Sequence, residues 1–180
     1  TQVGRSIIDE MERVGMVLCL SHAGERTVLD ALDYAKNPPI FSHSNPHGDH
    51  AHPRNVSDRV MKTCAAKGGV VGLSGLGPFL GVNERLSERL VRQLRYVIDL
   101  VGADHVGLGL DYVFDTDELN AHVRSNPALF PGGVSEDFPI LGPEVFDDIA
   151  EGLTQAKLSE NEIRGVLGEN WLRVAAQVWT

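Results

Sequence analysis

Two histidines and an aspartate follow apolar segments at three separate points of the chain. His22 ends the run "MVLCLSH", His43 follows "PPIFS", and Asp111 ends "HVGLGLD". Short continuous apolar runs are typical of strands buried on both faces of a parallel sheet. The carboxyl ends of parallel strands lie at one rim, so the three side chains are expected to converge there. Imidazole and carboxylate are ligands that Zn²⁺ accepts. One strand-end histidine alone more often has a structural role, but the three together indicate a site.

The segments around these residues alternate between strand and helix patterns. A parallel sheet with right-handed crossovers follows from that alternation. Either an open doubly wound sheet or part of a (β/α)8 barrel would have this order. We treat residues 1–180 as one α/β domain. The expected strands are 16–21, 40–44, 70–75 and 105–112, and the expected helices are 1–15, 24–36, 55–69, 84–102, 142–156 and 159–178, with a long loop at 113–141.

The composition excludes several classes of protein. The chain has 180 residues, is 42% hydrophobic and carries a formal net charge of −9, which fits one sizeable core and argues against binding nucleic acid. Its two cysteines do not form a disulfide scaffold or a zinc-knuckle motif. We expect no membrane span, because no apolar run reaches 18 residues. A nucleotide fingerprint of the G-x-G-x-x-G type is also missing after the first strand.

Six segments, in this order, resemble the membrane (renal-type) dipeptidases. They are "GMVLCLSH", "PPIFSHSN", "HPRNVSDRVMK", "GGVVGL", "HVGLGLDYVFD" and "LGENWLRV". These dipeptidases are metallopeptidases of the amidohydrolase superfamily, and the resemblance covers nearly the whole chain. It implies a (β/α)8 barrel of the TIM type with a binuclear Zn²⁺ site. It also implies hydrolysis of dipeptides with a free carboxyl-terminal carboxylate by a metal-bound hydroxide.

The resemblance assigns a role to four residues. His22 and His43 match ligands of one zinc ion. Arg54, in "HPRN", matches the arginine that binds the carboxylate of the dipeptide, for which a planar guanidinium is well suited. Asp111 matches the catalytic aspartate that moves a proton from water to the leaving amine. Cys19 stands where many relatives have an acid.

Other parts of the family pattern have no counterpart in this sequence. The His-x-Asp motif at the end of strand one and the bridging glutamate after strand three are both missing. We therefore predict that the chain is the carboxyl-terminal half of the barrel, strands five to eight, with terminal helices over 142–178. We expect its partners to be a dipeptide substrate and the missing amino-terminal half, which would cover the edges of the sheet. Complete barrels are expected to pair as a homodimer.

Three alternatives to the dipeptidase stay open. The same barrel could act on another amide or on a lactone, because a fold does not fix a substrate. The chain could be a non-catalytic half-barrel subunit, or an unrelated flavodoxin-like domain. Among the other histidines, we expect His52 to support Arg54, His47 and His50 to be solvated, and His105 to be structural.

Overall fold

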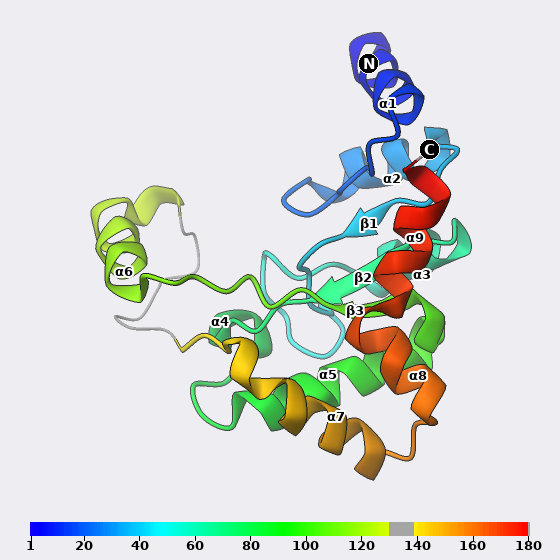
Figure 1. The fold of residues 1–180 in the computed structure, drawn as a ribbon. Coiled ribbons are helices and arrows are strands. Elements are labelled where there is room, and N and C mark those ends of the chain that lie inside the picture. The colour runs from blue at the N-terminus through cyan, green and yellow to red at the C-terminus, as the bar shows by residue number, and fades with distance from the viewer. Residues whose placement is uncertain (130–138, 180) are drawn as a thin grey trace.

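A small parallel sheet lies at the centre of the computed structural model, which describes residues 1–129 and 139–179 (Figure 1). Its order is β1-β2-β3. Ile40 pairs with Val70, and Gly72 pairs with Gly107, all in parallel. The strands are β1 (Ile40–Phe41), β2 (Val70–Leu73) and β3 (Val106–Leu108). The helices are α1 (Gln2–Arg13), α2 (Glu25–Tyr34), α3 (Asp58–Ala66), α4 (Gly77–Leu80), α5 (Leu86–Val101), α6 (Thr116–Ser125), α7 (Phe146–Gln155), α8 (Glu160–Arg164) and α9 (Asn170–Val178).

The first predicted strand lies beside β1, although it forms only one bridge. Cys19 pairs with Ile40 in parallel. The amide of Leu20 donates to the carbonyl of Ile40 over 2.8 Å, and the amide of Ile40 donates to the carbonyl of Leu18 over 2.9 Å. The four predicted strands therefore run side by side in sequence order, each shorter than expected.

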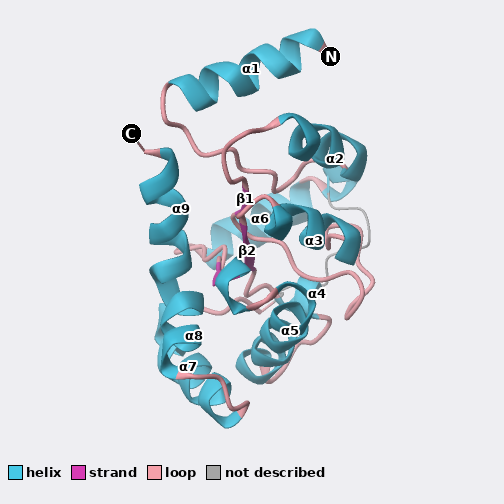
Figure 2. Ribbon diagram, turned by 90° about the vertical axis from the view of Figure 1, so that its right-hand side faces the viewer, coloured by secondary structure: helices cyan, strands magenta, loops and turns pink. Residues whose placement is uncertain are grey.

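Helices cover both faces of the sheet (Figure 2). Phe41, Val71 and Leu73 point to the face covered by α2, α3 and α5 and are fully buried in the main core. Helix α5 is amphipathic, and Leu90 and Leu94 of its apolar stripe reach the same core. On the other face, buried and partly buried residues of the strands form a second cluster with α9. That cluster contains Val17, Ile40, Val70, Trp171, Val174 and Val178. The predicted α/β fold is confirmed.

The indole of Trp171 requires glycine at two neighbouring positions of the sheet. A Cβ on Gly72 would lie 2.7 Å from Cζ2 of Trp171, and a Cβ on Gly107 would lie 2.6 Å from its Nε1. The indole N–H also donates to the carbonyl of Leu108 over 3.2 Å. Because Gly72 of β2 and Gly107 of β3 carry no side chain, the indole of Trp171 fits against the sheet, and α9 packs closely on this face.

Gly107→Ala is expected to lower the free energy of unfolding by about 1–3 kcal/mol, because the new methyl group displaces the indole. Urea denaturation would measure the change. Gly24→Ala is the matched control: Gly24 has φ −67°, and a Cβ there meets no atom within 4 Å. We expect that control to stay within about 0.5 kcal/mol of wild type. An equal loss in both variants would contradict the role given to Trp171.

The structure corrects two predicted segments. The expected loop over 113–141 contains α6, because the carboxylate of Asp115 accepts from the amide of Glu118 over 2.9 Å and caps the helix. Residues 130–138 of that loop lie outside the described residues. The expected helix over 159–178 is interrupted at Gly168, whose backbone is not helical, and forms α8 and α9 instead. Across 1–129 and 139–179, no helix is long and apolar enough to cross a membrane.

Candidate active site

The four predicted site residues lie together at one end of the sheet. His22 Nε2 lies 2.7 Å from His43 Nε2. Arg54 Nη2 lies 3.2 Å from His22 Nε2. Asp111 Oδ2 lies 4.0 Å from His43 Nε2. Residues separated by up to 89 positions (111 − 22) in the sequence thus form one cluster where the strands end.

Two of these residues have an uncommon backbone conformation. His22 has φ 68° and Asp111 has φ 59°, in the left-handed region. Histidine and aspartate enter that region more often than most residues, but at a steric cost. At His22 this conformation coincides with a turn of the chain just beyond the first parallel stretch. The apolar pattern of the sequence does not reveal either left-handed position.

The electrostatic surroundings favour a neutral imidazole at His22. Partial desolvation lowers its pKa, and the positive charges of Arg54 and His43 act in the same direction, against the opposing carboxylate of Asp111. A neutral ring keeps a lone pair for a cation. Desolvation also lowers the pKa of Arg54, although a guanidinium remains charged at any ordinary pH.

The loop that carries Arg54 is anchored to α5 by a buried carboxylate. Asp49, whose side chain is only 6% exposed, forms an ion pair with Arg89. It also accepts a hydrogen bond from Nε2 of Gln93 over 3.1 Å. On the other side of the loop, Nδ2 of Asn55 donates to the carbonyl of His50 over 2.9 Å. Because α5 packs into the core, the loop has a rigid support.

The guanidinium of Arg54 rests on an aromatic ring. Its Cζ lies 5.6 Å from the ring centre of Phe79 in α4. The ring of His52 lies 5.1 Å from that of Phe79, and the amide of Arg54 donates to His52 Nδ1 over 3.2 Å. The structure thus places His52 beside Arg54, as expected. Sequence reasoning missed Phe79 and Asp49. The sequence signal available for Asp49 was its place in the polar loop segment "NPHGDH".

The remaining histidines and cysteines take separate positions. His105 Nδ1 lies 2.8 Å from the carbonyl of Gly69, in keeping with a structural role. His47 is exposed. Burial raises the pKa of the Cys64 thiol to about 12, so this thiol is unreactive at neutral pH. Cys19 is exposed and lies 3.2 Å from the hydroxyl of Ser42.

The cluster fits a zinc ion in kind but supplies an incomplete set of ligands. Its two imidazole nitrogens converge on one point, and neutral imidazole is a common zinc ligand. Within the described ranges, no group of three or more histidine, cysteine, aspartate or glutamate side chains could hold a metal ion. The predicted histidine pair would therefore supply two of the four ligands that a tetrahedral zinc site takes.

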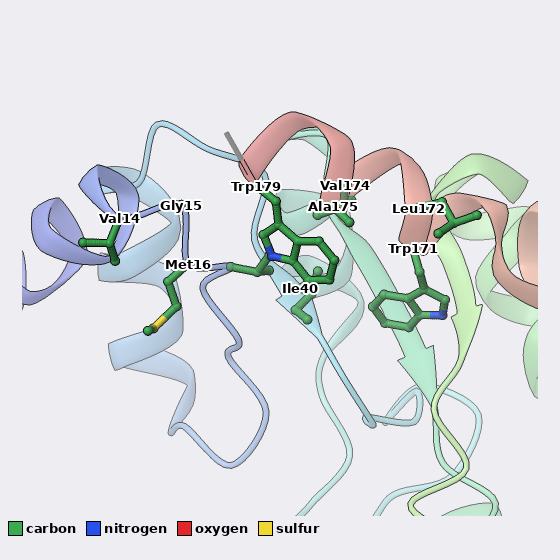
Figure 3. A pocket seen from close by; sticks show the side chains of 10 residues that line it. Val14, Gly15, Met16, Ile40, Trp171, Leu172, Val174, Ala175 and Trp179 are labelled. Atoms are coloured by element: carbon green, nitrogen blue, oxygen red, sulfur yellow. The ribbon is translucent and has the colours of Figure 1, made fainter.

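Two cavities differ sharply in position and polarity. A cavity of about 260 Å³ adjoins the cluster and is lined by His22 and Arg54 together with Pro53 and Ser57. A second cavity, of about 610 Å³, is apolar, and none of the four site residues lines it. Figure 3 shows Trp171 and Trp179 of the α9 region facing it. Of these two cavities, the smaller one is the one that adjoins the cluster.

Several known proteins are similar to this chain in sequence. The model of the membrane dipeptidase family (Peptidase family M19) matches residues 1–130. Dipeptidase tcpJ of Claviceps purpurea is 30% identical over 178 residues, which are 97% of this chain and 37% of that protein. The uncharacterized dipeptidase C965.12 of Schizosaccharomyces pombe is 32% identical over 174 residues, which are 95% of this chain and 38% of that protein.

Solved structures of similar proteins share the fold of this chain. An amidohydrolase from Pseudomonas aeruginosa superposes with a TM-score of 0.86 at 32% identity, over 99% of this chain and 57% of that one. A metallo peptidase from Rhodobacter sphaeroides, liganded with a phosphinate mimic of the dipeptide L-Ala-D-Ala, gives 0.77 at 26% identity, over 99% and 47%. The chain spans 37–38% of the two curated relatives above. By its sequence match, this chain belongs to the membrane dipeptidase family, peptidase family M19, whose members are peptide-bond hydrolases.

Proposed function

We propose that these residues serve a zinc-dependent dipeptidase that cleaves dipeptides with a free carboxyl-terminal carboxylate. The observation that carries the proposal is the convergence of His22, His43, Arg54 and Asp111 at one end of the sheet. Family membership and the dipeptide mimic bound by the Rhodobacter relative support the same substrate class.

Each residue has a task that suits its chemistry. His22 and His43 hold the metal. The chemistry that zinc supplies when bound is the acidification of a water molecule and the polarisation of a carbonyl. Arg54 binds and orients the substrate carboxylate with a planar pair of donors. Asp111, 4.0 Å from His43 Nε2, takes a proton from the attacking water and gives it to the leaving amine.

The proposal extends to the architecture. The four parallel stretches would be strands five to eight of a (β/α)8 barrel, and the other half would supply the remaining ligands of a binuclear site. Support comes from the strand order and from the share of the solved relatives that the chain covers, 57% and 47%. Pairing of complete barrels as a homodimer stays a prediction, which sedimentation analysis can check.

The position of Arg54 favours a carboxylate substrate over a lactone. Its guanidinium is 3.2 Å from the ring that would hold the metal, so a negative group there would lie beside the reacting bond. A lactone offers no such charge. A non-catalytic half-barrel subunit would keep the fold but would not hydrolyse dipeptides. Measuring hydrolysis by the wild-type protein distinguishes this alternative.

Arg54→Ala is expected to raise KM for dipeptides by about 10–100-fold and to change kcat little, since a hydrogen bond to a charged group contributes about 1.5–3 kcal/mol. The corresponding dipeptide amides, which lack the carboxylate, should be hydrolysed equally by variant and wild type. Steady-state kinetics with both substrates, in zinc-supplemented buffer, measures this.

The matched control is Arg59→Ala, which removes an exposed arginine from α3 and should leave both substrates unaffected. Equal losses with the dipeptide and its amide would refute the role of Arg54. Absence of hydrolysis by wild type with either substrate would instead support the non-catalytic subunit.

A further inference from the structure

The cavity beside Arg54 contains a carboxylate that the proposed reaction does not use. Glu25 is the first residue of α2, and Ser57 directly precedes α3. Both residues line the cavity of about 260 Å³ together with Arg54. The hydroxyl of Ser57 donates to Oε1 of Glu25 over 3.0 Å. The starts of two helices are thus joined by a hydrogen bond between two residues of the cavity wall.

The hydroxyl of Ser57 holds Glu25 instead of capping its own helix. Ser57 occupies the N-cap position of α3, where a serine side chain usually accepts from a backbone amide of the first turn. Here the side chain makes no such bond, and its hydrogen points to Glu25. The contact therefore fixes the carboxylate at the cavity.

Glu25 keeps most of its capacity to accept hydrogen bonds. An ionised carboxylate has about four acceptor sites, and Ser57 fills one of them. Within residues 1–129 and 139–179, Glu25 forms no ion pair with a lysine, arginine or histidine side chain. The residue is exposed. A group that enters the cavity with hydrogens to donate thus finds an acceptor of negative charge.

Much of the remaining lining is apolar. Leu20, Val28, Val56 and Val60 contribute to it, and all four pack in or against the main core. Apolar walls suit the methylene stem of a long side chain whose charged end stays with polar partners. The volume lies just below the range of about 300–1,000 Å³ that is typical for drug-sized ligands, so it fits a single amino-acid side chain.

We propose that Glu25 selects dipeptides whose carboxyl-terminal residue has a basic side chain, such as lysine. The inference rests on the proposed function, because Arg54 has to bind the substrate carboxylate. The side chain of that substrate residue leaves the carbon atom next to the carboxylate, and it therefore enters the cavity that Arg54 lines. Its ammonium group donates to Glu25, whereas an acidic side chain would meet a like charge.

Steady-state kinetics of the complete protein in zinc-supplemented buffer tests this selection. The substrates are Ala-Lys, Ala-norleucine and Ala-Glu, where norleucine has the apolar stem of lysine without the ammonium group. Each is prepared with an L- and a D-residue at the second position, because the Rhodobacter relative binds a mimic of L-Ala-D-Ala.

In the series that is hydrolysed faster, kcat/KM of wild type should be about three- to fivefold higher for Ala-Lys than for Ala-norleucine. A partly exposed ion pair has an effect of this size. The ratio should fall as salt is added, because salt screens exposed charges.

Three variants assign the preference to one carboxylate. Glu25→Gln removes the charge and keeps the size, so the ratio should approach one. Ser57→Ala should lower the ratio in part, because the carboxylate loses its hydrogen-bond donor. Asp30→Asn is the matched control: it removes an exposed carboxylate of α2 outside the cavity lining and should keep the wild-type ratio. An equal fall in Glu25→Gln and Asp30→Asn would show a general effect of surface charge and would overturn the proposal.

Binding of substrate mimics is a readout that needs no turnover. Phosphinate mimics of Ala-Lys and Ala-norleucine, measured by isothermal titration calorimetry, should differ in affinity by the same factor in wild type and be equal in Glu25→Gln. Equal values for both in wild type, or a preference for Ala-Glu, would overturn the role of Glu25 alone. Failure to hydrolyse any of the dipeptides and to bind either mimic would refute the proposed function, and with it the role of Glu25.

Discussion

His43→Ala is expected to abolish zinc binding at this site and to lower kcat/KM for dipeptides by about a thousandfold. Metal assistance contributes several kcal/mol to such reactions, and about 1.4 kcal/mol corresponds to a factor of ten. In the variant, His22 is the only imidazole of the pair that remains. Zinc normally takes four ligands, so the loss of one from this site weakens binding strongly. Zinc content after dialysis and the rate of dipeptide hydrolysis are the two measurements.

His47→Ala is the control for this result, because His47 is an exposed histidine of the following loop. It should retain zinc and activity. The unfolding midpoint of His43→Ala should stay close to wild type, since the ring contacts the polar groups of His22 and Ser42. Full activity in metal-depleted His43→Ala would refute the metal-dependent reaction.

Asp49→Ala is expected to lower the free energy of unfolding by about 3–5 kcal/mol. That is the usual cost of removing one partner from a buried ion pair, because the other charge stays buried without compensation. The side chain of Arg89 is 15% exposed, and its Nη1 already has no hydrogen-bond partner. Urea denaturation measures the loss, and KM for dipeptides should rise as well, because the Arg54 loop loses its anchor.

An exposed ion pair provides the comparison. Glu88 and Arg85 lie 2.7 Å apart with side chains 62% and 75% exposed. Glu88→Ala should cost less than about 1 kcal/mol, because water screens such pairs. Asp49→Asn keeps an acceptor for Gln93 and should fall between the two. A loss in Asp49→Ala no greater than in Glu88→Ala would show that the buried pair does not hold the loop.

Prediction from sequence succeeded where a local pattern carries the information. The apolar runs before His22, His43 and Asp111 indicate strands, and parallel strands bring their carboxyl ends together. The stripe of α5 is equally legible, because its apolar residues recur at helical spacing. Strand lengths were overestimated: the run before His22 makes a single bridge through Cys19.

The remaining features depend on contacts between distant segments. Helix α6 has one buried side chain, Val123, so its apolar pattern is weak, and only the cap at Asp115 marks it. The support of Arg54 by Phe79 and the pairing of Asp49 with Arg89 join residues that no sequence period connects. The half-barrel remains a proposal, because four parallel stretches do not close a barrel by themselves.

The left-handed backbone at His22 and Asp111 has a consequence for engineering. A non-glycine residue in that conformation costs about 1–3 kcal/mol, which glycine would recover. A library of variants selected only for thermal stability would therefore enrich glycine at positions 22 and 111. Those variants would lose the imidazole and the carboxylate of the proposed site. Stability and catalytic activity make opposite demands at these two positions, so a screen for stability has to be paired with a screen for activity.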